Sequence, residues 1–133
     1  MKITADTNLL VRAVTEDDPR QSRAAQTILS KADVVALTIP ALCELAWVLS
    51  QGYKTPASQI AEAIRRLVGG TNVVVNRPAV QAGLAMVDAG GDFADGAIAY
   101  EGNWLGADAF VSFDKKAVKQ LEAQGLSAEL LSR

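Results

Sequence analysis

Residues 2–14 have the sequence KITADTNLLVRAV, in which a strand-like run ends at an acidic residue and a helix-like run follows. We predict a first strand over residues 2–6 and a short helix over residues 8–14. In parallel α/β sheets the carboxyl ends of the strands share one edge, and ligands bind in the crevice there. Asp6 therefore lies where a functional carboxylate is expected.

Strand-like and helix-like segments alternate along the rest of the chain without a low-complexity linker or an internal repeat. Further strands are predicted at residues 34–39, 73–75, 109–113 and 126–131. Further helices are predicted at residues 22–32, 40–52, 78–89, 93–105 and 115–123, with another between Thr55-Pro56 and Gly69-Gly70. The chain has 133 residues, half of them apolar. The pattern predicts a single α/β domain over residues 1–133 with a real hydrophobic core.

Four more acidic residues stand where such a fold can gather them: Glu44, Asp92, Asp95 and Asp114. Asp114 directly follows a predicted strand, and the pair Asp92 and Asp95 opens a predicted helix. Glu44 is the only charged residue in the stretch 34–53. An unpaired carboxylate against a core is costly, so Glu44 must reach solvent, a cation or a partner. A cluster of carboxylates repels itself unless a cation fills it.

The composition narrows the choice of cation. The chain has no His and one Cys, Cys43, which excludes His-based catalytic triads and most zinc or copper sites. Carboxylate oxygens suit hard cations, and we expect Mg²⁺ or Mn²⁺.

Each aspartate also has a purely structural interpretation. Asp6, Asp92 and Asp114 each precede a predicted helix, where an aspartate accepts hydrogen bonds from exposed N–H groups. Asp95, at the third helical position, complements the positive end of the helix dipole. Trp47 and Trp104 are expected in the core.

The net charge of −2 gives no general attraction to nucleic acid, so basic residues can attract it only locally. Arg12, Lys115 and Lys116 lie beside the first and last acidic motifs and are candidate contacts for RNA phosphates. A single cysteine, no leader ahead of Asp6 and no long apolar span predict a cytoplasmic protein without a membrane anchor.

Four motifs together resemble a known family: DTNLLVR (residues 6–12), PALCELAWVL (40–49), DFADGAIA (92–99) and VSFDK (111–115). In this order and spacing they resemble PIN-domain ribonucleases of the VapC toxin type, over essentially the whole chain. The resemblance implies a three-layer α/β/α sandwich with a central, mostly parallel sheet. It also implies Mg²⁺- or Mn²⁺-dependent RNA cleavage, homodimerisation, and inhibition by a cognate VapB-type antitoxin.

The resemblance also implies roles for single residues. Asp6, Glu44 and Asp95 match the core acidic ligands of the metal, Asp114 matches a more variable fourth, and Asp92 matches an acidic position ahead of the third. We expect catalysis from Asp6, Glu44, Asp95 and Asp114. Polar supporting positions are matched by Thr7, Asn8 and Ser112. Gly96 replaces a usual Ala, which is expected to weaken its helix by up to ~1 kcal/mol.

Three other functions fit parts of the pattern. A phosphoryl-transfer enzyme of the haloacid-dehalogenase type needs a second Asp where this chain has Asn8, and a receiver domain needs an Asp where it has Asn76. A catalytically inactive PIN-like domain that binds only a partner fits all four motifs.

An antitoxin helix would need an apolar groove. We expect this groove on an apolar face that is partly exposed. The alternative is that the same face is wholly internal. Its members are Leu45, Trp47, Val48, Leu49, Tyr53, Ile60 and Ile64.

Overall fold

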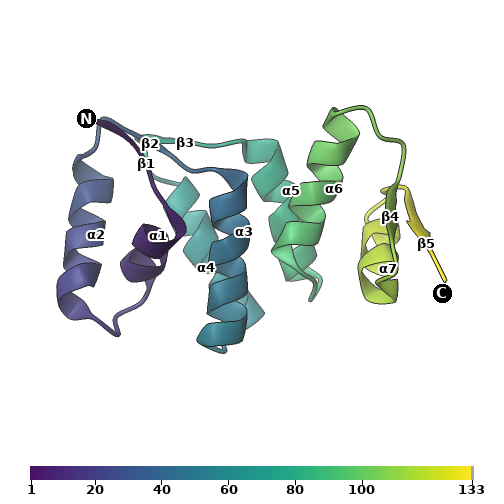
Figure 1. Ribbon diagram of the computed structural model, residues 1–133, viewed down its shortest axis with the longest axis horizontal. Helices are drawn as coiled ribbons and strands as arrows, with labels where there is room; N and C mark the ends of the chain where they lie inside the picture. Colours follow the sequence, from purple (N-terminus) through teal and green to yellow (C-terminus); the bar gives the residue numbers. More distant parts are fainter. Residues whose placement is uncertain (133) are drawn as a thin grey trace. The chain divides into compact units, whose positions relative to one another are not determined.

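The computed structural model describes residues 1–132 (Figure 1). Its helices and strands fall into two compact units, a first unit Met1–Asn76 and a second unit that begins at Arg77. Every strand pairing is parallel, so the predicted α/β class is confirmed.

The first unit contains three strands and five helical segments: β1 (Lys2–Thr4), α1 (Thr7–Val14), α2 (Pro19–Lys31), β2 (Val34–Ala36), α3 (Ile39–Trp47), the π-helix η1 (Val48–Gly52), α4 (Ala57–Val68) and β3 (Val73–Val74). The strand order is β1-β2-β3, with Ile3 opposite Val35 and Val35 opposite Val73. Val35 is almost fully buried, and so are Leu10 on α1 and Leu42 on α3. Burial of these apolar side chains stabilises the helices on the sheet.

Side-chain caps explain where the helices of the first unit begin. Asp18 accepts a hydrogen bond from the backbone N–H of Gln21, and Thr38 accepts one from Ala41. Proline follows each cap in the first turn, at Pro19 and Pro40, where its missing N–H costs nothing. The helix predicted over residues 40–52 is correct in extent, but its last turn widens into η1.

The second unit contains three helices and two strands: α5 (Arg77–Asp88), α6 (Phe93–Trp104), β4 (Phe110–Ser112), α7 (Lys115–Ala123) and β5 (Ala128–Leu130). β4 and β5 are parallel, with Val111 opposite Glu129. In chain order and type these elements match the prediction.

Two glycines allow α5 and α6 to pack closely. A Cβ atom on Gly96 would lie 2.2 Å from the carbonyl oxygen of Ala82, and one on Gly83 would lie 2.5 Å from the ring of Phe93. Gly96 therefore serves helix packing, a role that its low helix propensity alone does not indicate. The Phe93 ring is buried in the space that Gly83 leaves.

Both tryptophans were predicted in the core, and that prediction is wrong. Trp47 is 61% exposed and Trp104 is 74% exposed. Of the expected apolar face, Leu45, Leu49, Ile60 and Ile64 are buried, whereas Trp47 and Tyr53 reach the surface. Among residues 1–132, no helix combines the length and apolar character needed to cross a membrane.

Candidate active site

Asp6 links the first strand to the first helix. It follows β1 and is the N-cap of α1, where the backbone N–H of Leu9 donates a hydrogen bond to Asp6 Oδ1 (2.9 Å). Asp6 and Asn8 are exposed, and Thr7 between them is half-buried. The cap fixes the Asp6 carboxylate at the end of β1, as the sequence predicted, and leaves the group open to solvent.

Glu44 lies on α3, and its side chain reaches solvent. Its neighbours Leu42 and Leu45 are fully buried, so the exposure of Glu44 confirms that this carboxylate had to leave the core. α3 packs against α1, the helix that Asp6 caps. The first unit thus supplies two exposed carboxylates from adjacent helices.

Two aspartates of the second unit are also helix caps. Asp92 accepts a hydrogen bond from the N–H of Ala94 at the start of α6 (3.2 Å), and Asp114 accepts one from Ala117 at the start of α7 (3.1 Å). The hydroxyl of Ser112 accepts a hydrogen bond from the backbone N–H of Asp114 (2.9 Å). Ser112 therefore positions Asp114, and Asp114 stands after β4 as Asp6 stands after β1.

Asp95 is influenced by the charges of two other aspartates of the second unit. It is the third residue of α6 and is half-buried. Its pKa is raised above the ordinary value of 3.8, chiefly by burial and then by the charges of Asp92 and Asp114. Asp92 and Asp114 are therefore close enough to Asp95 to raise its pKa, and a cation beside Asp95 would offset this repulsion.

Carboxylate oxygens are the ligands that Mg²⁺ and Mn²⁺ prefer, so the chemical type of these side chains suits a hard divalent ion. Within residues 1–132, no three His, Cys, Asp or Glu side chains form a group able to hold a metal ion. Lys115 and Lys116, the candidate phosphate contacts beside Asp114, are exposed in the first turn of α7.

An open hollow of about 590 Å³ lies beside Asp6 in the first unit. Its lining comes from α1 with its cap and from α2: Asp6, Asn8, Leu9, Arg12, Gln21, Ala24, Ala25 and Ile28. Arg12, the other candidate phosphate contact, therefore shares this hollow with Asp6. Glu44 does not line it.

A network around Asp17 holds Arg12 in place. Arg12 Nη1 donates to Asp17 Oδ1 (3.2 Å), and the hydroxyl of Tyr53 donates to Asp17 Oδ2 (2.8 Å). The Thr15 hydroxyl lies 3.1 Å from Oδ1. The Tyr53 hydrogen bond is the largest influence on the pKa of Asp17 and lowers it. Burial is the next largest and raises the pKa, while Thr15 and Arg12 lower it further, so the net shift is downward.

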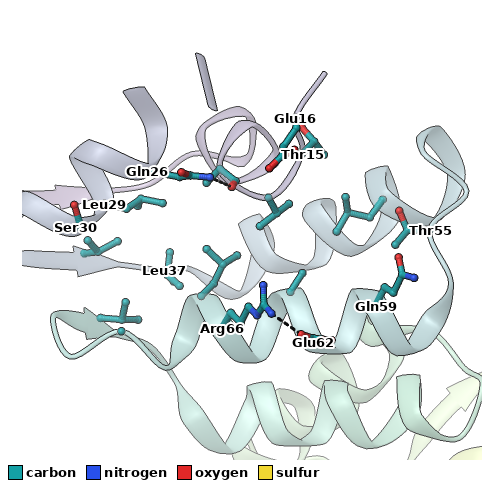
Figure 2. A pocket seen from close by; sticks show the side chains of 18 of the residues that line it. Thr15, Glu16, Gln26, Leu29, Ser30, Leu37, Thr55, Gln59, Glu62 and Arg66 are labelled. Atoms are coloured by element: carbon teal, nitrogen blue, oxygen red, sulfur yellow. Dashed lines mark hydrogen bonds and ion pairs between the residues drawn. The ribbon is translucent and has the colours of Figure 1, made fainter. Parts of the chain in front are cut away.

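A second cleft of about 670 Å³ lies elsewhere in the first unit, where α1 and α2 face α4 (Figure 2). Part of its lining is apolar and comes from Val35 and Val73 of the sheet and from Leu37, which follows β2. Polar groups such as Gln26, Gln59 and the ion pair of Arg66 with Glu62 (2.8 Å) surround this part. None of the predicted metal ligands lines this cleft.

The PIN-domain family profile matches residues 3–122, which include all four sequence motifs. The chain belongs to the PIN-domain family. The PIN domain is a nuclease-type fold whose members typically use divalent metals such as Mg²⁺. The α/β architecture with parallel strands agrees with the three-layer α/β/α fold of PIN domains. No curated protein matches the chain.

The roles of Asp17 and Tyr53 in this PIN domain were not predicted. Asp17 lies between the helices predicted at residues 8–14 and 22–32, and Tyr53 belongs to the predicted apolar face. The spacing of Arg12 and Asp17, five residues apart across the end of α1, was the available signal for the ion pair. Nothing local in the sequence indicates that Tyr53 reaches back to Asp17, since the two are 36 residues apart.

Proposed function

We propose that this PIN domain is a metal-dependent ribonuclease and the toxin of a type II toxin–antitoxin system of the VapC kind. The observation that carries the proposal is the acidic cluster of the second unit, in which burial and the charges of Asp92 and Asp114 raise the pKa of Asp95. Such a cluster lowers the stability of a fold unless a cation binds it. In a nuclease family whose members typically use divalent metals, such carboxylates are suited to act as metal ligands.

The proposed ligands come from the four sequence motifs that resemble PIN-domain ribonucleases. We assign Asp6, Glu44 and Asp95 as the principal ligands, with Asp92 and Asp114 in supporting roles. The PIN-domain match spans parts of both units, which supports our proposal that residues 1–133 form one functional PIN domain. The solvent exposure of Asp6 and Glu44 supports their availability to an ion.

In the proposed reaction, the metal ion and the side chains of the protein have different roles. A bound Mg²⁺ or Mn²⁺ would lower the pKa of a water molecule and offset charge on the phosphoryl oxygens. Because the chain has no His, a carboxylate must accept the proton that the attacking water loses. The helix caps limit the motion of the Asp6 and Asp114 side chains, and pre-positioning of this kind lowers the entropic cost of reaction. Arg12, Lys115 and Lys116 would bind phosphates of the RNA, and Thr7 and Asn8 would support the Asp6 end.

The proposal is tested by incubating the purified protein with a pool of single-stranded RNA oligonucleotides in Mg²⁺, in Mn²⁺ and in EDTA. We expect cleavage in either metal, none in EDTA, and none by Asp95→Asn in any buffer. The control is Asp108→Asn, which removes an exposed carboxylate outside the four motifs and should keep the parental rate. Cleavage in EDTA, or by Asp95→Asn at the parental rate, would refute the proposed metal centre.

The toxin role adds a partner and a second copy of the chain. The resemblance implies a homodimer, and the exposed apolar side chains Ile98, Trp104 and Leu105 on and after α6 are available to a second copy of the chain. Trp47 and the cleft of Figure 2 offer apolar surface to a VapB-type antitoxin. Co-expression with the product of the neighbouring gene should relieve growth arrest and give a stable complex, whereas a monomer indifferent to that product would contradict the toxin role.

A further inference from the structure

The hollow beside Asp6 is lined by an acidic residue at one end and a basic residue at the other. Asp6 lies at the start of α1, and Arg12 lies on the same helix nearly two turns further on. The exposed amide side chains of Asn8 and Gln21 also line the hollow. The Asp6 end thus suits a cation, and the Arg12 end suits an anion.

The apolar part of the lining comes from both helices. Leu9 of α1 and Ile28 of α2 contribute branched side chains, and Ile28 is 37% exposed. The small side chains of Ala24 and Ala25 leave room beside Ile28. A flat ring placed there would cover exposed apolar surface and remain within reach of the two amide side chains.

A hydrogen bond to Asp17 orients Arg12, which lines this hollow. Asp17 accepts a hydrogen bond from one guanidinium nitrogen, and it is fixed in turn by Tyr53. A guanidinium carries five N–H donors, so the pair with Asp17 leaves donors for a second anion. An arginine already oriented by a carboxylate loses less side-chain entropy when it binds a phosphate.

We propose that the hollow between α1 and α2 binds one nucleotide of single-stranded RNA beside the cleavage site, with a phosphate on Arg12 and the base against Leu9 and Ile28. Asn8 and Gln21 face the polar edge of that base, and Asp17 and Tyr53 are positioning residues that act through Arg12. The assignment rests on the proposed ribonuclease function and adds a substrate subsite to it.

A nucleotide fits this combination better than a partner helix does. Sites for small ligands usually measure roughly 300–1,000 Å³ and combine apolar walls with a few polar groups, as this hollow does. Proteins recognise single-stranded RNA through bases splayed onto such surfaces and through their hydrogen-bonding edges. An amphipathic helix would instead need a continuous apolar groove, and here Arg12, Asn8 and Gln21 interrupt the apolar lining.

The first test measures binding without cleavage. Backbone and side-chain amide signals are followed by NMR in EDTA while the four nucleoside 5′-monophosphates, or ribose 5-phosphate, are added. We expect signals of Asn8, Arg12 and Gln21 to shift, and at least one nucleotide to bind more tightly than ribose 5-phosphate. Equal binding of ribose 5-phosphate would overturn the base contact, and shifts confined to other residues would overturn the site.

The second test uses two variants that remove the same charge. Arg12→Gln should raise the Kd for a single-stranded oligoribonucleotide about tenfold, and should reduce the slope of log K against log salt by about 0.7. Arg23→Gln, on the exposed surface of α2 outside the hollow, should change neither. Equal effects of the two variants would refute a specific phosphate contact at Arg12.

Positioning is tested through Tyr53→Phe, which removes the hydrogen bond to Asp17 and keeps the Arg12 charge. We expect a severalfold rise in Kd with an unchanged salt slope, and an unchanged Kd would overturn the positioning role. If the protein binds nucleotides in this way but never cleaves RNA, the subsite stands and the ribonuclease proposal fails. If it cleaves RNA and Arg12→Gln binds as the parent does, only the subsite fails.

Discussion

Gly96→Ala is predicted to destabilise the protein, although alanine is the better helix former. The added methyl group would lie 2.2 Å from the carbonyl oxygen of Ala82 and 2.7 Å from Met86 Cγ. The Met86 side chain can move, but the carbonyl belongs to the backbone of α5 and cannot move alone. The substitution must therefore push α6 away from α5.

The expected size follows from two opposing effects. Replacing Gly by Ala inside a helix stabilises it by up to ~1 kcal/mol. Forcing a methyl group into a close-packed contact typically costs about 1–3 kcal/mol, and a fixed backbone neighbour places Gly96 at the upper end or beyond. The free energy of unfolding should then fall by about 1–2 kcal/mol net. For a chain of this length that corresponds to a decrease in Tm of roughly 4–8 °C.

Gly102, near the end of the same helix, provides the matched control. A Cβ atom there would meet nothing within 4 Å, so Gly102→Ala should stabilise the protein by up to ~1 kcal/mol. Thermal and urea unfolding of the parent and both variants, followed by circular dichroism, gives the comparison. Stabilisation by both variants would contradict the close approach of α5 and α6 at Gly96.

Three further predictions concern the acidic residues. The folded protein binds a proton on Asp95 more tightly than the unfolded chain does, so its stability falls as pH rises through the interval above 3.8 and stays lower at neutral pH. In EDTA, Asp95→Asn should therefore be more stable than the parent at pH 7 and lose this advantage in acid; equal urea midpoints at both pH values would contradict the raised pKa. Asp6→Ala should lower the free energy of unfolding by ~1 kcal/mol because the cap on Leu9 is lost, while Asp6→Asn should not; equal losses in a urea titration would show that the cap contributes nothing. Mn²⁺ at a hundred times its Kd should stabilise the folded protein by about 2.7 kcal/mol, and a melting curve of the parent that ignores Mn²⁺ would argue for carboxylates that serve only as caps.

Local sequence rules were sufficient to predict most of the fold. Asp6 and Asp114 follow short apolar runs, and each proved to be the residue where a strand gives way to a helix. The same residues were expected as caps or as functional carboxylates, and the structure shows the caps. A cap constrains only one carboxylate oxygen, so the structural role does not compete with a role in binding.

The features that local sequence rules do not predict depend on distant parts of the chain. The packing role of Gly96 could not be predicted, because the carbonyl of Ala82 that it contacts belongs to another helix. Trp47 and Trp104 looked like core residues by hydrophobicity, yet their helices bury other faces. The hydrogen bond from Tyr53 to Asp17 likewise joins segments that no periodic pattern relates.

The most direct test of the account is the rate of RNA cleavage in Mg²⁺ by Asp6→Asn and Glu44→Gln, each beside a matched control. Asp18→Asn is the control for Asp6, because Asp18 caps α2 in the same way, and Glu101→Gln removes an exposed glutamate outside the proposed ligand set. An amide keeps the shape and the cap but lacks the charge that holds a cation. We predict folded proteins throughout, parental rates for both controls, and no detectable cleavage by Asp6→Asn or Glu44→Gln. Cleavage by either of these two variants at the parental rate would contradict the proposed metal centre.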